Sequence, residues 1–227
     1  RNRYGQYQSD SQLQAAHAHC PWLVTWDDHE FDNDYATFHS EEPGVMAAAF
    51  MKRRANAYQA YYEHMPLRRS SIPAGPFMQL YRRVRYGRLA DFAILDTRQY
   101  RTPQANGNGL KPLVGEVLDP NATILGAKQE AWLRRKWLES KAEWNVMAQQ
   151  VLMARVDRLP GPAEGFPMDK WAGYEVCRQR VMQSLADLKV PNPVVLTGDI
   201  HSNWVCDLPL DYKRPEKTVV GTEFVCT

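Results

Sequence analysis

Four consecutive residues near the start of the chain can bind a metal ion or move a proton: Asp27, Asp28, His29 and Glu30. They follow a short β-prone run at residues 23–26, and α/β enzymes present chemistry at the carboxyl ends of strands. Carboxylates this close together raise each other's pKa unless a cation or hydrogen-bond donors neutralise them. The stretch therefore predicts a cation site, and an acidic surface loop is the alternative.

The kind of cation site is narrowed by excluding three stricter motifs. A zincin helix requires a second histidine four residues after His29, where the chain has Asn33. An EF-hand loop counted from Asp28 requires glycine and glutamate where the chain has Asn33 and His39. No cysteine lies close enough for a structural zinc site. An oxygen-rich site with one histidine remains, which suits Ca, Mg, Mn or Fe.

A second polar segment, residues 96–101, follows an apolar run that predicts a strand at residues 89–95. It contains Arg98 and Arg101, and the planar fork of a guanidinium is suited to binding phosphate. The alternative is a structural ion pair with Asp96.

A third polar segment follows the apolar run at residues 194–196, which predicts a buried strand. Gly198 lets the backbone turn, and Asp199 and His201 come directly after it. Side chains two residues apart on an extended segment face the same side, so we expect Asp199 and His201 to share one metal. A purely structural role for this pair is the alternative.

The elements that position these segments are predicted from periodicity, caps and breakers. Helices are expected from Ser9 or Asp10 to Cys20, from residues 41–43 to Pro66, and over residues 126–142 and 169–188. A hairpin is expected over residues 77–95 with its turn at Gly87, and a strand over residues 144–153. Residues 102–123 are expected to form a long loop. Residues 52–54 are expected on a solvated helix face, and a phosphate clamp is the alternative. Gln149 and Gln150 interrupt a buried strand, so either both bond locally or one faces the site.

The whole chain has 227 residues, 44% hydrophobic and 11% aromatic, which predicts a globular α/β protein with one large domain. Its net charge of +2 gives no electrostatic argument for a nucleic-acid partner. The longest apolar run, residues 45–51, is far too short to span a membrane. The P-loop, the dinucleotide fingerprint and the nucleophile elbow are absent from the sequence. Cys206 and Cys226 are expected either to bridge in an oxidising compartment or to stay free.

Four motifs, in order along the chain, resemble the PhoD-like (alkaline phosphatase D) family of the metallophosphoesterase superfamily: TWDDHEFDNDY, ILDTRQYR, LGAKQEAWL and LTGDIHSNW. The resemblance implies a four-layer α/β core, with two β-sheets packed together and flanked by helices. It also implies hydrolysis of phosphate monoesters or diesters at a multinuclear centre of iron and calcium. A non-catalytic calcium- or phosphate-binding domain that kept the fold is the alternative.

The resemblance also assigns roles to individual residues. Asp28 falls on the asparagine and His29 on the histidine of the superfamily's GNHE motif, and residues 198–201 fall on its GHxH motif. Asp28, Asp199 and His201 are thus expected metal ligands, and His29 and Arg98 are expected catalytic residues. Asp27, Asn33 and Arg101 are expected to contact the substrate. The superfamily's VxxH ligand falls near Gln149, which leaves that ligand in doubt.

The family's earlier motifs, including an aspartate that binds the first metal, are absent from the chain as written. We therefore expect residues 1–227 to be one metallophosphatase catalytic domain that lacks sequence at both ends. The family implies an exported protein, although no signal segment is present in these residues.

Overall fold

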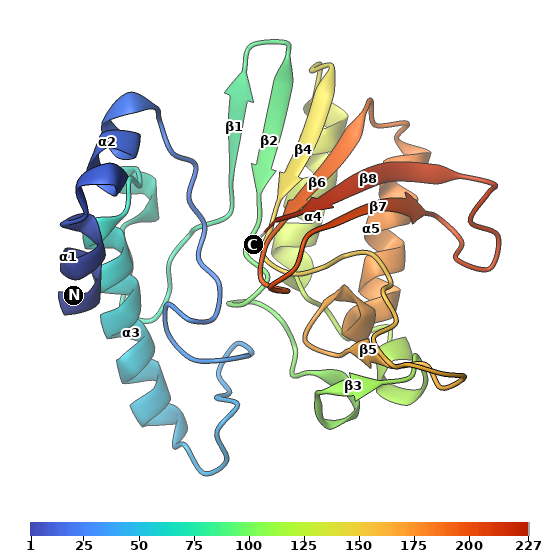
Figure 1. Ribbon diagram of the computed structural model, residues 1–227, viewed down its shortest axis with the longest axis horizontal. Helices are drawn as coiled ribbons and strands as arrows, with labels where there is room; N and C mark the ends of the chain where they lie inside the picture. Colours follow the sequence, from blue (N-terminus) through green and yellow to red (C-terminus); the bar gives the residue numbers. More distant parts are fainter. Residues whose placement is uncertain (227) are drawn as a thin grey trace.

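A six-stranded mixed sheet lies at the centre of the computed structural model, which describes residues 1–226 (Figure 1). Its strand order is β1-β2-β4-β6-β8-β7. The strands are β1 (Arg82–Tyr86), β2 (Ala90–Ile94), β4 (Trp144–Ala148), β6 (Pro193–Thr197), β7 (Trp204–Pro209) and β8 (Val219–Val225). A second, two-stranded sheet pairs β3 (Leu110–Lys111) with β5 (Phe166–Pro167). The expected α/β class, with two sheets and flanking helices, is confirmed, and the second sheet is small.

Five α-helices accompany the sheets: α1 (Asn2–Gln8), α2 (Ser11–His19), α3 (Ala47–His64), α4 (Gly126–Glu139) and α5 (Glu175–Asp187). Helices α4 and α5 cover one face of the large sheet, whereas α1, α2 and α3 form a separate layer beside β1 (Figure 1). The core lies between the sheet and α4 and α5, where Leu133 and Val181 of the helices join Met147 and Val195 of the strands. No helix in residues 1–226 combines the length and the apolar composition needed to cross a membrane.

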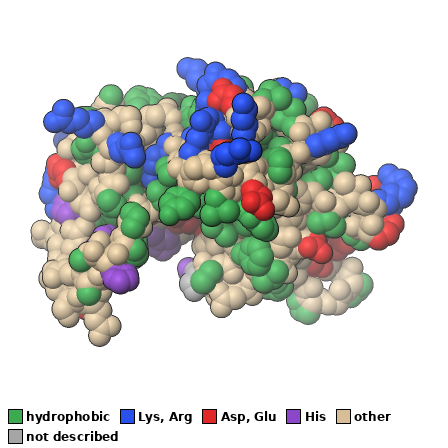
Figure 2. All heavy atoms as spheres, turned by 90° about the horizontal axis from the view of Figure 1, so that it is seen from above, with side chains coloured by type: hydrophobic (Ala, Val, Ile, Leu, Met, Phe, Trp, Pro, Cys, Tyr) green, Lys and Arg blue, Asp and Glu red, His purple; other side chains and the backbone are tan. Residues whose placement is uncertain are grey.

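The opposite face of the large sheet carries apolar side chains that remain accessible. Leu196, Phe224 and Val205 occupy matched positions on β6, β8 and β7, and all three are exposed. Figure 2 shows hydrophobic side chains gathered in the middle of the molecule seen from above, with Lys and Arg side chains along one edge.

Strand direction brings the polar segments together. Strands β2, β4, β6 and β8 are parallel, so their carboxyl ends meet at one edge of the sheet. The segment 96–101 leaves this edge after β2, and the segment with Asp199 leaves it after β6. The expectation that both segments follow apolar strands is therefore confirmed.

Two expectations for the first third of the chain are wrong. Residues 23–26 do not form a strand, because their polar contacts run through side chains: the Thr25 hydroxyl donates to Leu95 O, and the Arg82 guanidinium donates to Val24 O. Helix α3 begins at Ala47 rather than at residues 41–43, although it ends before Pro66 as expected.

Helix boundaries elsewhere follow the local signals. Asp10 caps α2 by accepting from the backbone of Gln12 and Leu13. The helix expected over residues 169–188 begins as a 3₁₀ turn at Trp171–Tyr174 and continues as α5. Strand β4 ends at Ala148, five residues earlier than expected.

Gln149 and Gln150 bond locally, and neither faces the metal centre described below. The Gln149 amide donates to Val151 O and Thr197 Oγ1 and accepts from the Trp171 indole. The Gln150 amide accepts from Thr97 and donates to Leu95 O. Both amides therefore join neighbouring strand ends, which satisfies their buried polar atoms.

The four cysteines are free, and the possible bridge between Cys206 and Cys226 is not formed. In the antiparallel pairing of β7 and β8, Cys206 lies opposite Glu223, three residues from Cys226. Three residues along a strand span about 10 Å, which is too far for a disulfide.

Candidate metal centre

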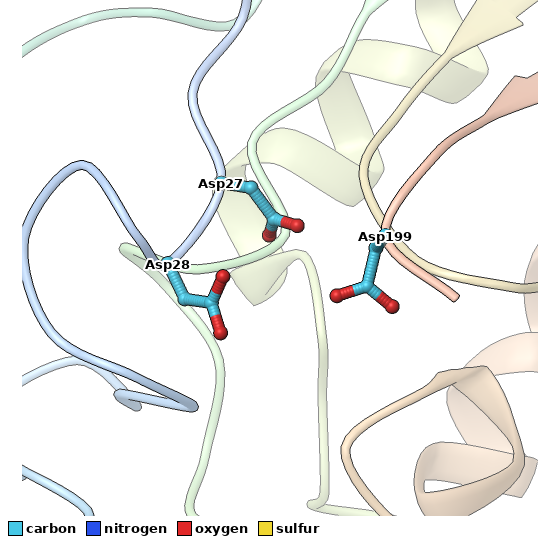
Figure 3. Close-up of side chains that lie close together, drawn as sticks. All are labelled: Asp27, Asp28 and Asp199. Atoms are coloured by element: carbon cyan, nitrogen blue, oxygen red, sulfur yellow. The ribbon is translucent and has the colours of Figure 1, made fainter. Parts of the chain in front are cut away.

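Three carboxylates converge at the carboxyl edge of the large sheet. Asp27, Asp28 and Asp199 each offer one oxygen, and these oxygens all lie within 4.8 Å of one another. Asp27 and Asp28 come from the loop after Trp26, and Asp199 comes from the loop after β6 on the opposite side (Figure 3). Such an arrangement of oxygen donors is suited to a hard cation. Asp27 was expected to contact the substrate, whereas the structure places it among the candidate metal ligands.

The Asp28 carboxylate is fixed by its own loop. One oxygen accepts from the backbone N–H of His29 at 2.9 Å, and the other accepts from that of Asp34 at 3.0 Å. The Asp28 carbonyl also closes a turn with Phe31 and Asp32. The loop therefore positions Asp28 through backbone bonds that require no particular side chain elsewhere.

The loop after β6 is not extended at Asp199 and His201, so the expected geometry of this pair is wrong. Both residues have positive φ, +70° and +57° respectively. These left-handed conformations are uncommon for residues other than glycine and cluster at functional sites. The turn brings Asp199 into the carboxylate group, whereas His201 lies on the wall of the same cavity.

Arg98 lies in the middle of the carboxylates and is completely buried. Its guanidinium contacts Asp169 at 2.9 Å, Asp199 at 3.1 Å and Asp27 at 2.5 Å, and it lies 3.6 Å from Asp28. It forms no ion pair with Asp96, whose carboxylate instead accepts from the backbone N–H groups of Arg98 and Gln99. Arg98 therefore binds several carboxylates at once, which the sequence did not indicate.

Arg101 is also completely buried. Its guanidinium donates to the carbonyls of Tyr35 and Asp34 and pairs with Asp169 at 2.6 Å. A substrate contact would require some of these bonds to be exchanged. In this arrangement Arg101 holds the loop of residues 27–35 against Asp169.

Three residues of this site were missed by the sequence interpretation: Asp34, Asp169 and Lys170. Lys170 pairs with Asp169 at 3.0 Å and with Asp199, and Asp34 lies 3.8 Å from Arg98. Asp34 belongs to the same acidic stretch as Asp28, so its place in the site could have been predicted from the sequence. Asp169 and Lys170 follow a proline- and glycine-rich segment in which no long apolar run precedes them, so no local sequence pattern marks them.

Together these residues form the aspartate cluster, defined as Asp27, Asp28, Asp34, Asp169 and Asp199. Three cationic side chains contact the five carboxylates, namely Arg98, Arg101 and Lys170, so the cluster carries two more negative charges than positive ones when all five carboxylates are ionised. Because the cluster is mostly buried, this excess charge is unfavourable unless a cation or water compensates it.

The pKa shifts reflect this imbalance. Burial raises the pKa of Asp199 to about 6, although Lys170 opposes the shift. Burial also raises the pKa of Asp34, with Asp169 adding to the effect. Burial acts in the same direction on Asp28 and Asp169, but their neighbours outweigh it and lower both pKa values: Arg98 and the Asp34 N–H for Asp28, and Arg101, Arg98 and Lys170 for Asp169. An added cation would therefore favour the charged forms of Asp199 and Asp34, which burial disfavours.

A cavity of about 490 Å³ opens onto the cluster. Its walls include His29, Asn33 and His201, which are exposed, together with Asp28, Asp199 and Lys170. The Asn33 amide donates to Glu41. A second cavity of about 480 Å³ shares Asp34 and Lys170 with the first and is otherwise lined mainly by residues 107–110. The site thus has room beside the carboxylates for a ligand with an organic group.

Comparison with known proteins identifies the family and supports the fold. The PhoD-like phosphatase family matches residues 1–227. The chain is 50% identical to alkaline phosphatase D of Bacillus subtilis (strain 168) over 227 residues, which are all of this chain and 39% of that protein. A solved structure described as "Structure of PhoD" superposes with a TM-score of 0.95 at 50% identity, over all of this chain and 43% of the other. The chain thus spans about two fifths of the length of these relatives, and it belongs to the PhoD-like phosphatase family.

Proposed function

We propose that the complete protein hydrolyses phosphate esters and that the aspartate cluster is the half of its metal centre that these residues contribute. The observation that carries the proposal is the cluster itself: five carboxylates face only three cationic side chains at the carboxyl edge of a sheet. Membership of a phosphatase family supplies the reaction class.

The donor set fits hard cations. Every ligand atom that converges is a carboxylate oxygen, and Asp28, Asp199 and His201 remain our proposed ligands, with Asp27 added by its position. Calcium and iron are the proposed metals because the family resemblance implies them, and the oxygen-rich donor set with one imidazole is compatible with both. When bound, such cations neutralise phosphate oxygens and lower the pKa of a coordinated water.

The chain's own residues then have separate tasks. Arg98 holds Asp27, Asp169 and Asp199 in one place, and its positive charge limits their mutual repulsion. His29 is exposed on the cavity wall next to Asp28, and the bond from its N–H to Asp28 fixes its backbone there, so its imidazole has access both to the cavity and to water. We propose that it protonates the leaving alkoxide. Asn33 and Lys170 are proposed to contact the substrate.

His29→Ala in the complete protein is expected to lower the hydrolysis rate roughly 10²–10⁴-fold while leaving the metal content unchanged. The loss should be smaller for nitrophenyl esters, because nitrophenolate needs little protonation to leave. Rates for an alkyl and a nitrophenyl ester, with metal analysis, check this. His17→Ala, a change of an exposed histidine on α2, is the matched control. An equal loss for good and poor leaving groups would exclude the acid role.

The substrate is proposed to be a diester at least as readily as a monoester. The second cavity lies directly beside the cluster, and residues 107–110 on its wall carry no charge, so it offers space for a second organic group without adding a cationic clamp. Hydrolysis of bis-nitrophenyl phosphate is therefore expected to match or exceed that of nitrophenyl phosphate when calcium is supplied and to fall in the presence of a chelator.

Two results would change this proposal. A monoester preference of about a hundredfold or more would contradict the diester assignment, because it would imply a site built for a dianion. No hydrolysis of either ester with metals restored would favour the alternative, a calcium- or phosphate-binding domain. Export of the complete protein is a further proposal that rests on the family alone.

A further inference from the structure

A separate cavity of about 420 Å³ lies on the other side of the 96–101 loop from the aspartate cluster. It is bounded by α3, the loop carrying Gln99 and Tyr100, and the first turn of α4. Its lining includes two basic residues, Arg54 and Lys128, and no acidic residue. A cavity with this charge balance favours an anion.

Arg54 is the residue that makes this cavity unusual. It was expected on a solvated helix face, but it is completely buried. Its guanidinium donates to the Thr37 carbonyl and, at 3.0 Å, to Gln99 Oε1, while its Nε has no hydrogen-bond partner among residues 1–226. Within the same residues no carboxylate oxygen lies within 4.0 Å of it. A buried guanidinium without a direct counter-charge is costly, and an anion in the adjoining cavity would offset that cost.

The start of α4 adds to the positive potential. The N-cap residue of α4, Leu125, offers no side-chain cap, although the Gly126 N–H donates to Thr123 Oγ1 at 2.9 Å. The first turn has no acidic residue, and the first three residues of the helix all line the cavity. The helix dipole favours an anion at this end, yet the sequence places Lys128 there. Gly126 has φ +71°, and a Cβ on it would lie 3.0 Å from Tyr100 Cβ, so the helix begins directly against the Tyr100 wall.

Aromatic rings form the remaining walls. Phe38 packs edge-on against Phe77, and Tyr81 packs edge-on against Tyr100. Phe38 and Phe77 remain about half exposed at the rim. The Arg54 guanidinium also lies over the Phe77 ring, 5.6 Å from its centroid. Rings of this kind bind flat apolar groups by stacking and by area burial.

We propose that this cavity, bounded by Arg54, Lys128 and the four aromatic rings, binds a small organic anion with a planar apolar body, through its carboxylate or phosphate group. The anionic group meets Arg54, Lys128 and the positive end of the α4 dipole, and the body lies between the rings. The site is distinct from the proposed phosphoesterase centre, with which it shares no lining residue.

The two sites are connected through one loop. Gln99 accepts from Arg54 and donates to Asp96 Oδ2, while Asp96 Oδ1 accepts from the backbone of Arg98. A ligand on Arg54 therefore contacts the same short segment that places Arg98 in the aspartate cluster.

The test is a titration of the complete metal-loaded protein with 4-fluorobenzoate, followed by fluorine NMR, with phenylphosphonate as the phosphate-like probe. Saturable binding in about the millimolar range is expected for a ligand of this size. Lys128→Glu should weaken binding about fivefold or more. Lys52→Glu makes the same charge change at an exposed position of α3 outside the cavity and should change affinity less than about twofold.

Arg54→Met is expected to weaken binding by about tenfold or more, provided that its melting curve shows a folded protein. If it does not fold, Lys128→Glu decides the question, because Lys128 is exposed. The proposal is overturned if neither probe binds saturably, if Lys128→Glu and Lys52→Glu have equal effects, or if neutral 4-fluorobenzyl alcohol binds as well as the anion. Loss of binding in Asp28→Ala without loss in Lys128→Glu would assign the probe to the metal centre and also overturn it.

Discussion

Asp28→Ala in the complete protein is expected to remove most of the bound metal and to lower the hydrolysis rate on the order of a thousandfold or more. Asp28 belongs to the group of three converging carboxylates, and both of its oxygens are positioned by backbone N–H groups of its own loop. The substitution removes one of the three proposed carboxylate ligands. Within residues 1–226, the two backbone N–H groups that position this carboxylate hold no other side chain there.

Metal content by elemental analysis and hydrolysis of a nitrophenyl ester should be measured on the same preparation. Asp187→Ala is the matched control, because Asp187 is an exposed aspartate on α5 that lines neither of the two cavities at the cluster. Asp199→Ala should behave like Asp28→Ala. His201→Ala is also expected to lower metal content and hydrolysis, because His201 lies on the wall of the same cavity, outside the group of three. Wild-type metal content in both Asp28→Ala and Asp199→Ala would refute the ligand assignment.

Arg98→Leu is expected to destabilise the fold by roughly 3–5 kcal/mol near neutral pH. The reason is the charge that it leaves behind: Arg98 is completely buried, and its removal takes the cationic partner from Asp27 and Asp28 and leaves Asp169 and Asp199 with only Arg101 and Lys170 as counter-charges. The free energy of unfolding from urea titrations measures the effect. Arg85→Leu, a change of an exposed arginine on β1, is the control and should cost less than about 0.5 kcal/mol.

The destabilisation should depend on pH and on calcium. In the wild type the neighbouring cations outweigh burial and lower the pKa of Asp169, so its stabilising contribution is present above its unfolded pKa and is lost as the pH falls through its folded pKa. In Arg98→Leu that contribution is reduced, and acid relieves the remaining repulsion. The difference between wild type and variant should therefore shrink on acidification, and added calcium should recover part of it. Equal losses for Arg98→Leu and Arg85→Leu would show that the cluster does not need its central cation.

The chemistry-bearing segments could be identified from the sequence because each is local. An apolar run followed by clustered polar residues predicts a strand end, and this holds for residues 96–101 after β2 and for Asp199 after β6. Ordered motifs then identified the family from residues alone, and the comparisons confirmed it. The stretch beginning at Asp27 was found although its expected strand does not form, because the clustered carboxylates themselves were the signal.

The interactions between segments were decided by the tertiary structure. The sequence predicted that Arg98 either binds phosphate or pairs with Asp96. In the structure it contacts aspartates from three other segments, at positions 27, 169 and 199. Asp169 and Lys170 carry no motif, and only the packing of the loop before α5 brings them to the cluster. Periodicity placed Arg54 in solvent, whereas the layer formed by α3 and the neighbouring loops buries it. Residue type and spacing report what a segment is able to do, but burial and counter-charges depend on contacts distant in sequence, and those exist only once the chain has folded.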